Sequence, residues 1–297
     1  MKKAIYVYNT LSGRGIDDRR LQLIEKNLNK TYDDVLILKT NTIEELENAS
    51  IKASEEKRDF IFSGGDGTFN QVVNVIMKLN EKPTLGYLPT GTTNDTAKNF
   101  LISRNIRKAL KVIANQQSVK FDLCLANDEK YFTYVAALGA FADIAYVTKR
   151  KAKKKIGNLA YYRKAFLEAF KPRRIHVLVK TKDETFACDV PFILVLNGRS
   201  VASFKIGKRD ELFDHKFHVY LTRPGPFNGL LHYLFFKIKT YKIVTDEIFL
   251  EAKNTEDDWC LDGERGNKGK LHVKAIPKAL SIYVNPRLIK RMNKRPK

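Results

Sequence analysis

The chain has 297 residues, of which 54 are Lys or Arg and 33 are Asp or Glu, so its formal net charge is +21. Hydrophobic residues make up 43% of the chain, which is enough for a sizeable core and excludes wholesale disorder. The length predicts two domains, because a domain usually holds about 100–200 residues. The positive charge indicates an anionic partner, either a polyanion or an anionic membrane surface.

Cysteine usage and hydropathy are typical of a protein from a reducing compartment. The three cysteines, Cys124, Cys188 and Cys260, lie far apart and form no Cys-x-x-Cys pair. No apolar run approaches the roughly 18 residues that a membrane-spanning helix needs. The first apolar segment, Ala4–Tyr8, is too short for a secretory signal. We therefore expect a soluble cytoplasmic protein.

Residues 1–115 alternate between short strands and amphipathic helices. Strands are predicted at Ala4–Tyr8, Asp34–Leu38, Asp59–Phe62 and Thr84–Leu88. Apolar residues at helical spacing predict helices over 21–28, 43–53, 69–76 and 106–113. Ser103 is the predicted N-cap of the last helix. Strands that alternate with helices predict an α/β domain whose parallel sheet is covered on both faces.

After residue 120 the pattern changes to short strands in quick succession. They are predicted at 120–125, 131–136, 175–180, 192–196, 217–221, 247–252, 259–262, 271–275 and 280–284. Turn residues separate them, which is typical of a β-sandwich or a barrel-like domain. One helix is expected at 156–170, and the basic tail 287–297 is expected to be a short surface helix or a frayed end.

Polar loops follow three of the predicted parallel strands. The third strand runs into Ser63–Thr68, which reads Ser-Gly-Gly-Asp-Gly-Thr, the fourth runs into Pro89–Asp95, and the first is followed by Asn9–Gly13. Ligands in open α/β sheets bind outside the carboxyl ends of the strands, so we expect these loops at one rim. Ser63–Thr68 matches neither the Walker A nor the Gly-x-Gly-x-x-Gly pattern. Its glycines would still let the backbone approach a phosphate chain, and Asp66 would reach a Mg²⁺ on that phosphate.

These loops resemble a known family. Gly64–Thr68 followed by Pro89–Asp95 is similar to the diacylglycerol-kinase catalytic domain of bacterial soluble lipid kinases, to which sphingosine and ceramide kinases are more distantly related. Asn9–Gly13 resembles the first nucleotide loop of the family, with Thr10 in place of its usual proline. Leu261–Glu264 resembles the Asp-Gly-Glu motif of the family. The resemblance covers essentially the whole chain.

Two domains are implied by the resemblance. Residues 1–120 would form an N-terminal α/β ATP-binding domain, to which residues 285–297 return. Residues 121–284 would form a C-terminal β-sandwich that supplies part of the lipid site. The cleft between the domains would be the active site.

The activity that the resemblance implies is that of an ATP-dependent lipid kinase. The γ-phosphoryl group would pass to the hydroxyl of diacylglycerol or a similar membrane lipid, giving phosphatidic acid, with ATP and Mg²⁺ as cofactors. Motif by motif, the nucleotide contacts fall on Asn9, Ser12, Gly13, Thr40, Ser63, Gly64, Gly65, Asp66, Gly67, Thr68 and Thr92. Asp66 would bind or orient the catalytic Mg²⁺, with Asp95 in the same network. Glu264 would be the general base that takes the proton of the lipid hydroxyl.

A structural Mg²⁺ in the second domain is also implied by the resemblance. In the matching stretch, Asp210–Lys216, the ligands would be Glu211, Asp214 and the backbone carbonyl of Lys216. His215 stands where the family usually has glycine, and Glu211 stands where it often has serine. An acidic turn that pairs with neighbouring cations is the alternative.

Two segments suggest how the chain would meet a membrane. Lys149–Lys155 holds six cations in seven residues, and each cation near an anionic leaflet contributes about 1 kcal/mol of attraction. A solvated helix face is the alternative for this segment. Gly229–Phe236, the most apolar stretch, would be buried in the sandwich or line the entry for acyl chains. We therefore expect peripheral association with the membrane. The resemblance also suggests a homodimer, because relatives commonly pair through the first domain.

Two other functions stay open at this point. NAD kinases also carry Gly-Gly-Asp-Gly-Thr, although their second loop usually reads Gly-x-Asn-x-Gly rather than Thr-Gly-Thr-Thr-Asn-Asp. A catalytically idle nucleotide sensor or a nucleic-acid-binding protein would also use the positive charge. Asp66, Asp95 and Glu264 argue against an idle protein, and no RRM, KH or helix-turn-helix signature supports a nucleic-acid partner.

Overall fold

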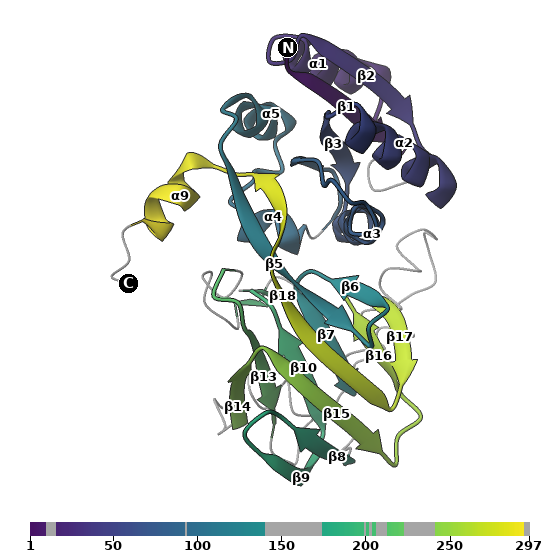
Figure 1. Ribbon diagram of the computed structural model, residues 1–297, viewed down its shortest axis with the longest axis vertical. Helices are drawn as coiled ribbons and strands as arrows, with labels where there is room; N and C mark the ends of the chain where they lie inside the picture. Colours follow the sequence, from purple (N-terminus) through teal and green to yellow (C-terminus); the bar gives the residue numbers. More distant parts are fainter. Residues whose placement is uncertain are drawn as a thin grey trace, which may run out of the picture. The chain divides into compact units, whose positions relative to one another are not determined.

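The computed structural model describes residues 1–9, 16–92, 94–139, 174–198, 200–201, 204–205, 213–222 and 241–293. The predicted helix 156–170 and the segments Lys149–Lys155 and Gly229–Phe236 lie outside the described residues. The chain divides into two compact units, which are labelled by element in Figure 1. Unit 1 comprises residues 1–123, 199–214 and 277–297, and unit 2 comprises residues 124–198 and 215–276. The division falls within β5 (Ser118–Ala126) and β18 (Lys270–Tyr283), because both strands run from one unit into the other.

Unit 1 is built on the predicted parallel sheet. Its strand order is β2 (Asp34–Lys39), β1 (Lys3–Tyr8), β3 (Asp59–Gly64), β4 (Leu85–Pro89), and the end of β18 pairs in parallel with β4. The four strands predicted in this region are confirmed. Most side chains of β1, β3 and β4 are buried, which is typical of a parallel sheet with helices on both faces.

Helices cover both faces of this sheet. They are α1 (Asp18–Leu28), α2 (Ile43–Glu55), α3 (Asp66–Ile76), α4 (Asp95–Asn99) and α5 (Ile106–Ala114). The helix α1 leads outward from β1 to β2, whereas α3 leads from β3 to β4 in the opposite direction along the sheet. Right-handed crossovers therefore put α1 on one face and α3 on the other. Because α1 packs against α5 and α2 packs against α3, each face carries one of these pairs.

The N-cap of α5 differs from the prediction. Asn105, not Ser103, caps the helix, and its side chain accepts a hydrogen bond from the Lys108 amide at 3.2 Å. The Ser103 hydroxyl instead accepts a bond from the Asn105 amide at 3.2 Å. Both residues are good cap formers, but Asn105 stands directly before the first helical residue and so reaches the free amides of the first turn.

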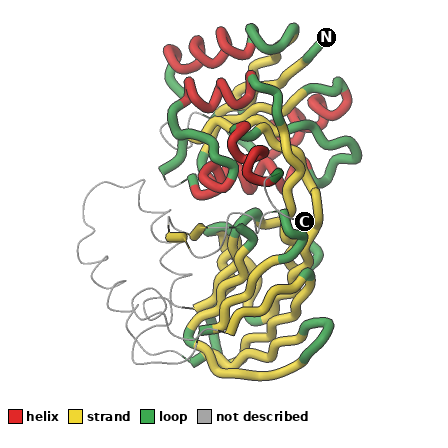
Figure 2. The backbone as a smooth tube through the Cα atoms, turned by 90° about the vertical axis from the view of Figure 1, so that its left-hand side faces the viewer, coloured by secondary structure: helices red, strands yellow, loops and turns green. Residues whose placement is uncertain are grey.

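Unit 2 is an antiparallel β-sandwich, as predicted. One sheet joins β18 to β15 (Glu247–Lys253), β8 (Ile175–Lys180) and β9 (Thr185–Val190). The order in the other sheet is β14 (Tyr241–Thr245), β13 (Phe217–Leu221), β10 (Phe192–Leu196), β7 (Val135–Gly139), β16 (Asp258–Leu261) and β17 (Glu264–Lys268). Both sheets contribute to one hydrophobic core, with Val177 and Leu250 from the first and Leu138, Val195 and Trp259 from the second. Figure 2 shows the contrast between the units, since the described helices are in unit 1.

Strand boundaries after residue 120 needed correction. The segment predicted as one strand over 131–136 is split into β6 (Lys130–Phe132), which pairs with β5, and β7. The two strands predicted over 271–275 and 280–284 are one strand, β18. Lys278 has a positive φ of 50° within it, and its amide donates to the Asp122 carboxylate at 2.8 Å. That side chain therefore replaces the ladder partner where the strand is irregular.

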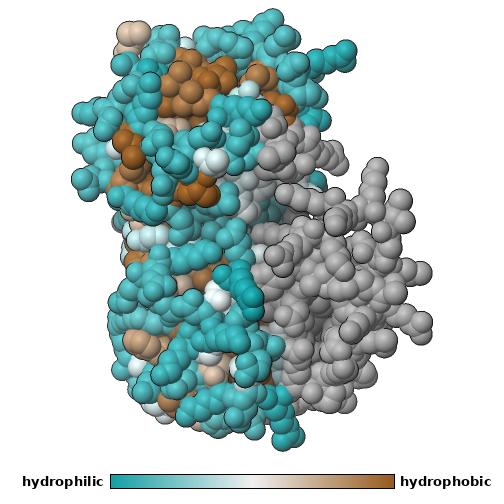
Figure 3. Space-filling model, turned by 90° about the vertical axis from the view of Figure 1, so that its right-hand side faces the viewer, coloured by the Kyte–Doolittle hydropathy of each residue, from teal (hydrophilic) through white to brown (hydrophobic). Residues whose placement is uncertain are grey.

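The remaining described elements are short. β11 (Ser200–Val201) pairs with β12 (Phe204–Lys205), and α9 (Pro286–Met292) forms the helix expected in the tail. Within the described ranges, no helix is both long and apolar enough to cross a membrane. Figure 3 shows a mostly hydrophilic described surface with hydrophobic patches. The exposed hydrophobic side chains include Ile43 and Ile51 of α2.

Candidate active site

The three predicted loops leave the same edge of the parallel sheet. Because β1, β3 and β4 are neighbours and run in parallel, Asn9, the segment Gly64–Thr68 and the segment Thr90–Thr92 all emerge at the carboxyl edge. Ser12 and Gly13 of the first loop lie outside the described residues. Asn9 is half-buried, and Thr92 is exposed at the tip of its loop. The structure therefore brings the described parts of all three loops to one rim of unit 1.

The second and third loops touch through glycines. A Cβ atom built on Gly91 would lie 2.5 Å from the Gly65 Cα, and one built on Gly65 would lie 3.2 Å from the Gly91 Cα. A side chain at position 91 would therefore clash with the Gly65 backbone, whereas one at position 65 would make a tight contact that a small shift could relieve. A Cβ on Gly64 would meet the Thr68 side chain at 2.4 Å. The result is a surface made of main chain at the carboxyl edge.

Asp66 lies in the first turn of α3. The helix therefore begins within the glycine motif, whereas the sequence predicted a start directly behind it. Gly65 is the N-cap, and Gly67 and Thr68 follow in the first turn. The Asp66 carboxylate accepts a hydrogen bond from the Thr96 amide at 3.0 Å. This bond links α3 to α4 and uses one oxygen of a side chain that is only 9% exposed. A carboxylate in the first turn is also favoured by the helix dipole.

Asn94 holds the third loop, Pro89–Asp95, in shape. It occupies the left-handed region with a φ of 51°, a conformation that asparagine tolerates better than most residues. Its side chain accepts a bond from the Gly91 amide at 3.1 Å and donates to the Gly91 carbonyl at 2.6 Å. The Tyr87 hydroxyl lies 3.1 Å from the Gly64 carbonyl and 3.3 Å from the Asn94 side-chain oxygen. Burial, and to a smaller extent the Asp66 charge, raises the pKa of Tyr87 well above its usual value, so the hydroxyl stays a donor.

Asp95 is buried next to this network. Its carboxylate pairs with the Lys98 ammonium at 2.8 Å, one helical turn along α4. The Asp95 side chain is 2% exposed and that of Lys98 is 41% exposed, so the lysine places its charge at the surface end of the pair. Asp66 and Asp95 are linked through the start of α4. The Thr96 amide, which donates to the Asp66 carboxylate, belongs to the residue directly after Asp95.

A pocket of about 200 Å³ lies on the α2–α3 face and is lined by four predicted nucleotide contacts, Asn9, Thr40, Ser63 and Thr68. The prediction missed four other polar lining residues, Tyr8, Asn41, Thr42 and Gln71. Gln71 follows Thr68 by three residues on α3, and this helical spacing could have revealed it. Ser63 is buried and accepts a bond from the Tyr6 hydroxyl at 3.1 Å.

The residues at this rim have the chemistry that a nucleotide and Mg²⁺ require. Main-chain amides at the start of α3 lack intrahelical partners, and such amides bind anions. Asp66 offers a carboxylate oxygen, the type of ligand that Mg²⁺ prefers. Two buried side-chain oxygens of α4, on Thr96 and Asn99, have no hydrogen-bond partner in the part of the chain that the structure describes. Polar groups of this kind call for a further ligand or water.

The Asp-Gly-Glu motif forms a tight turn between β16 and β17 in unit 2. Asp262 is fully buried, and its carboxylate accepts hydrogen bonds from the amides of Thr133, Tyr134 and Val135 and from the Thr133 hydroxyl, at 2.6–3.0 Å. These bonds explain why the predicted strand 131–136 breaks between β6 and β7. Burial raises the pKa of Asp262, while the four donors oppose that rise.

Glu264 begins β17, directly after this turn. Its carboxylate pairs with the Lys130 ammonium of β6 at 3.1 Å, and the two side chains are 34% and 35% exposed. Glu264 is therefore held by a surface ion pair that motif matching did not predict. Asp262 and Gly263, with φ values of 50° and 80°, set the direction in which the chain enters β17.

The predicted structural metal site is described only in part. Glu211 lies outside the described residues, whereas Asp214 and Lys216 are exposed in a bend. His215, between them, has a φ of 64° and so adopts the left-handed conformation for which glycine is favoured. Within the described ranges no cluster of three or more His, Cys, Asp or Glu side chains could hold a metal ion. This site stays a prediction.

Comparisons with known proteins agree on one family. The sequence model described as diacylglycerol kinase catalytic domain matches residues 3–126. Diacylglycerol kinase of Bacillus subtilis is 30% identical over 226 residues, which cover 75% of this chain and 74% of that protein. Diacylglycerol kinase of Staphylococcus carnosus is 30% identical over 205 residues, which cover 69% of this chain and 67% of that protein.

A solved structure shows the same fold. The crystal structure of a diacylglycerol kinase from Bacillus anthracis superposes with a TM-score of 0.79 at 20% sequence identity, covering 97% of this chain and 98% of that one. This likeness extends the shared fold over both units, beyond the part that the family's sequence model matches. The chain therefore belongs to the diacylglycerol kinase family of lipid kinases.

Proposed function

We propose that this lipid kinase transfers the γ-phosphoryl group of ATP to the hydroxyl of diacylglycerol or a similar membrane lipid, giving phosphatidic acid. The relatives named diacylglycerol kinase support the choice of acceptor. The observation that carries the proposal is the contact of two glycine loops, at Gly65 and Gly91, beside the buried Asp66 carboxylate. A main-chain surface next to one carboxylate suits a polyphosphate with its metal ion.

Each residue of the proposal has a chemical role. When bound, ATP supplies the phosphoryl group and Mg²⁺ neutralises charge on its oxygens. The amides of Gly67 and Thr68 at the start of α3 would bind phosphate oxygens, and Asp66 would hold the metal. Asp95 would contribute to the same network, kept in place by its ion pair with Lys98. Glu264 would accept the proton of the attacking lipid hydroxyl.

One assay tests the reaction as a whole. The purified protein is incubated with γ-labelled ATP, Mg²⁺ and either diacylglycerol in mixed micelles or NAD. We expect label in phosphatidic acid and none in NADP. Label in NADP would overturn the proposal, and no transfer to diacylglycerol would exclude diacylglycerol as the acceptor.

The role of Glu264 is tested by the Glu264→Gln variant. We expect turnover to fall by a factor of about 10²–10⁴, which is the usual contribution of a general base, while affinity for a non-hydrolysable ATP analogue is kept. The fold should tolerate the change, because an ion pair at the protein surface contributes about 0–1 kcal/mol. Glu256→Gln is the matched control, since Glu256 is 95% exposed in its ion pair with Lys268. Turnover equal to that of the control would remove Glu264 from the role of base.

We also propose that the protein associates with the membrane surface through Lys149–Lys155. The concentration of six cations in seven residues supports this. Sedimentation with anionic liposomes at rising salt tests it, because attraction between exposed charges is screened beyond about 8–10 Å at cellular ionic strength. Binding that does not respond to salt would contradict the proposal.

A further inference from the structure

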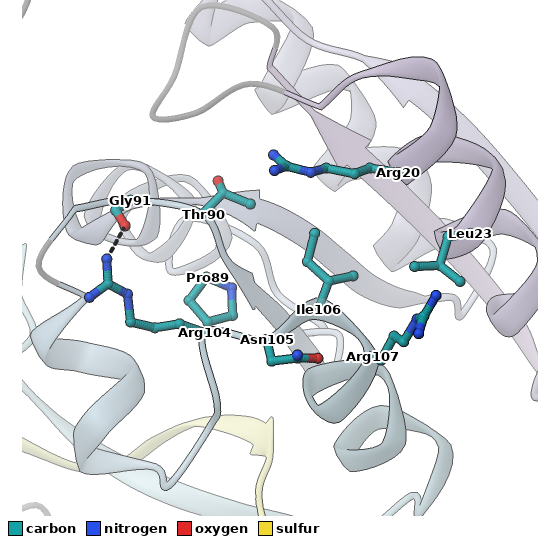
Figure 4. A pocket seen from close by; sticks show the side chains of 9 residues that line it. All are labelled: Arg20, Leu23, Pro89, Thr90, Gly91, Arg104, Asn105, Ile106 and Arg107. Carbon is teal, nitrogen blue, oxygen red and sulfur yellow. Dashed lines mark hydrogen bonds between the residues drawn. The ribbon is translucent and has the colours of Figure 1, made fainter.

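A second pocket of unit 1, of about 500 Å³, lies on the α1–α5 face at the end of β4. Figure 4 shows Arg20 extending from α1 and Arg107 from the start of α5 at two sides of this space, with Ile106 between them. Thr90 and Arg104 also line it, and Arg104 donates to the Gly91 carbonyl at 3.4 Å. Three arginines, from α1, from the first turn of α5 and from the loop between α4 and α5, therefore line one cavity.

The described charged residues that line this pocket are all cations. Among the described residues that line it, three are arginines and none is Asp or Glu. Arg20 also lies 3.8 Å from the Asp17 carboxylate, and both side chains of this ion pair are more than a third exposed. The N-terminus of α5, a helix of nine residues, adds positive potential. A concave surface with charges of one sign concentrates counter-ions.

The pocket is separate from the one that contains the predicted nucleotide contacts. The smaller pocket is lined by side chains of α2 and α3, such as Leu46 and Gln71, whereas the arginine pocket is lined by α1 and α5. Because these helix pairs cover opposite faces of the parallel sheet, the two pockets lie on opposite faces as well. Both pockets reach the carboxyl edge of the parallel sheet, the smaller one at Ser63 of β3 and the arginine pocket at Pro89 of β4.

We propose that the arginine pocket binds a phosphomonoester group, with Arg20 and Arg107 as its principal anion-binding side chains. The planar guanidinium group matches the oxygens of a phosphate in a two-pronged geometry, and several such groups suit a dianion better than a carboxylate. The volume of about 500 Å³ exceeds what a bare phosphate needs, and Leu23 and Ile106 supply an apolar wall for the organic part of the ligand. This inference goes beyond the lipid kinase activity and does not depend on it.

Two probes distinguish the sources of such a group. Glycerol 3-phosphate represents a free phosphomonoester, and dihexanoyl phosphatidate below its micellar concentration represents a lipid headgroup. Isothermal titration should show binding of at least one probe, and glycerate, which carries a carboxylate, should bind more weakly. Arg20→Ala and Arg107→Ala should each weaken binding about tenfold, because a hydrogen bond to a charged group contributes about 1.5–3 kcal/mol.

The matched control is the double variant Arg19→Ala, Lys108→Ala. Arg19 and Lys108 are exposed neighbours of the two arginines and do not line the pocket, so net charge falls equally while the pocket is kept. The control should bind the probe within about twofold of the unaltered protein, since distant charges are screened. The double variant Arg20→Ala, Arg107→Ala is the pocket double variant. If it and the control lost the same affinity for the probe, the loss would come from the lower net charge alone, and the proposal would be overturned. It would also be overturned if neither probe bound, or if the pocket double variant lost affinity for a non-hydrolysable ATP analogue to the same extent.

Discussion

At the scale of single residues, the site depends on glycines that let two backbones touch and on side chains that form hydrogen bonds with neighbouring backbone groups. Gly65 and Gly91 bring two backbones together, whereas Asn94 and Asp262 use side chains to satisfy neighbouring backbone groups. In each case a polar group that would be costly to bury alone finds a partner. Small changes at these positions should therefore have large effects.

Gly91→Ala should destabilise unit 1 and weaken ATP-analogue binding more than Gly65→Ala. The added Cβ would lie 2.5 Å from the Gly65 Cα and 2.7 Å from the Asn94 side-chain oxygen, whereas the Cβ of Gly65→Ala approaches to 3.2 Å. We expect a loss of about 1–3 kcal/mol for Gly91→Ala, as for other overpacked sites. Urea denaturation together with analogue titration measures both effects. A larger loss for Gly65→Ala would contradict the described contact.

Asp262→Asn should lower the free energy of unfolding by about 3 kcal/mol. Whichever oxygen is replaced by the amide nitrogen, two of the four donors around the carboxylate lose their acceptor in a fully buried position. Chemical denaturation followed by Trp259 fluorescence suits the measurement, since Trp259 is buried in unit 2. Asp183→Asn, in the exposed β8–β9 turn, is the control and should change stability by less than about 0.5 kcal/mol. Equal stabilities would show that the four bonds contribute little.

At the scale of elements, helix starts determine where the site residues point. Glycine at the N-cap places Asp66 in the first turn of α3, and this explains why the carboxylate lies at the sheet edge and not one turn further along. The same dependence on caps applies to α5, whose first turn carries Arg107. A shift of the cap by two residues would rotate these side chains by about half a turn.

The cap of α5 can be tested directly. Asn105→Ala should lower the free energy of unfolding by about 1 kcal/mol, because the Lys108 amide loses its acceptor. Ser103→Ala removes only the bond from the Asn105 amide and should have a smaller effect. Thermal and urea denaturation of both variants give the comparison. A larger effect at Ser103 would support the cap that the sequence predicted.

At the scale of the whole molecule, strands distant in sequence are joined by buried polar groups. The Asp59 carboxylate, at the start of β3, accepts bonds from the Tyr32 hydroxyl at 2.9 Å and from the Tyr283 hydroxyl at 2.5 Å. Gln116 bonds to both tyrosines, so the cluster ties the end of β18 to the first strands of the chain. Return of the C-terminal segment to unit 1 thus has a specific polar contact as well as the pairing of Ile282 with Leu85.

This cluster predicts a pH dependence. Burial raises the pKa of Asp59 above its unfolded value, although the bonds from Tyr283 and Tyr32 oppose the rise. The folded chain therefore binds more protons than the unfolded chain at pH values just above about 4, and its stability falls as the pH rises through the folded pKa. Asp59→Asn removes the titrating carboxyl group and with it this pH dependence. The free energy of unfolding of the unaltered protein, relative to that of the variant, should therefore decrease between about pH 4 and neutrality. Urea denaturation at several pH values, with Asp183→Asn as the control, measures it, and a constant difference would contradict the prediction.

The sequence by itself determined the parallel α/β unit, the sandwich and the motif residues at the loops. Local patterns in the sequence indicate each of these, such as the apolar run Ala4–Val7 for the first strand and the glycines beside Asp66 for the motif. The ion pair of Lys130 with Glu264, by contrast, joins residues 134 positions apart, and no local pattern records it.

Only the tertiary structure decided which polar groups meet. The predicted strand is interrupted at Thr133, whose amide donates to the buried Asp262 carboxylate. Strand β18 continues past Lys278 because the Asp122 carboxylate accepts the hydrogen bond of the Lys278 amide. The tertiary structure also brought Arg20 and Arg107 to one pocket from helices that are separated by three strands of sequence. The physical reason is the same in each case: hydrogen bonds and charges act over a few ångströms of space, whereas propensity and periodicity act along the chain.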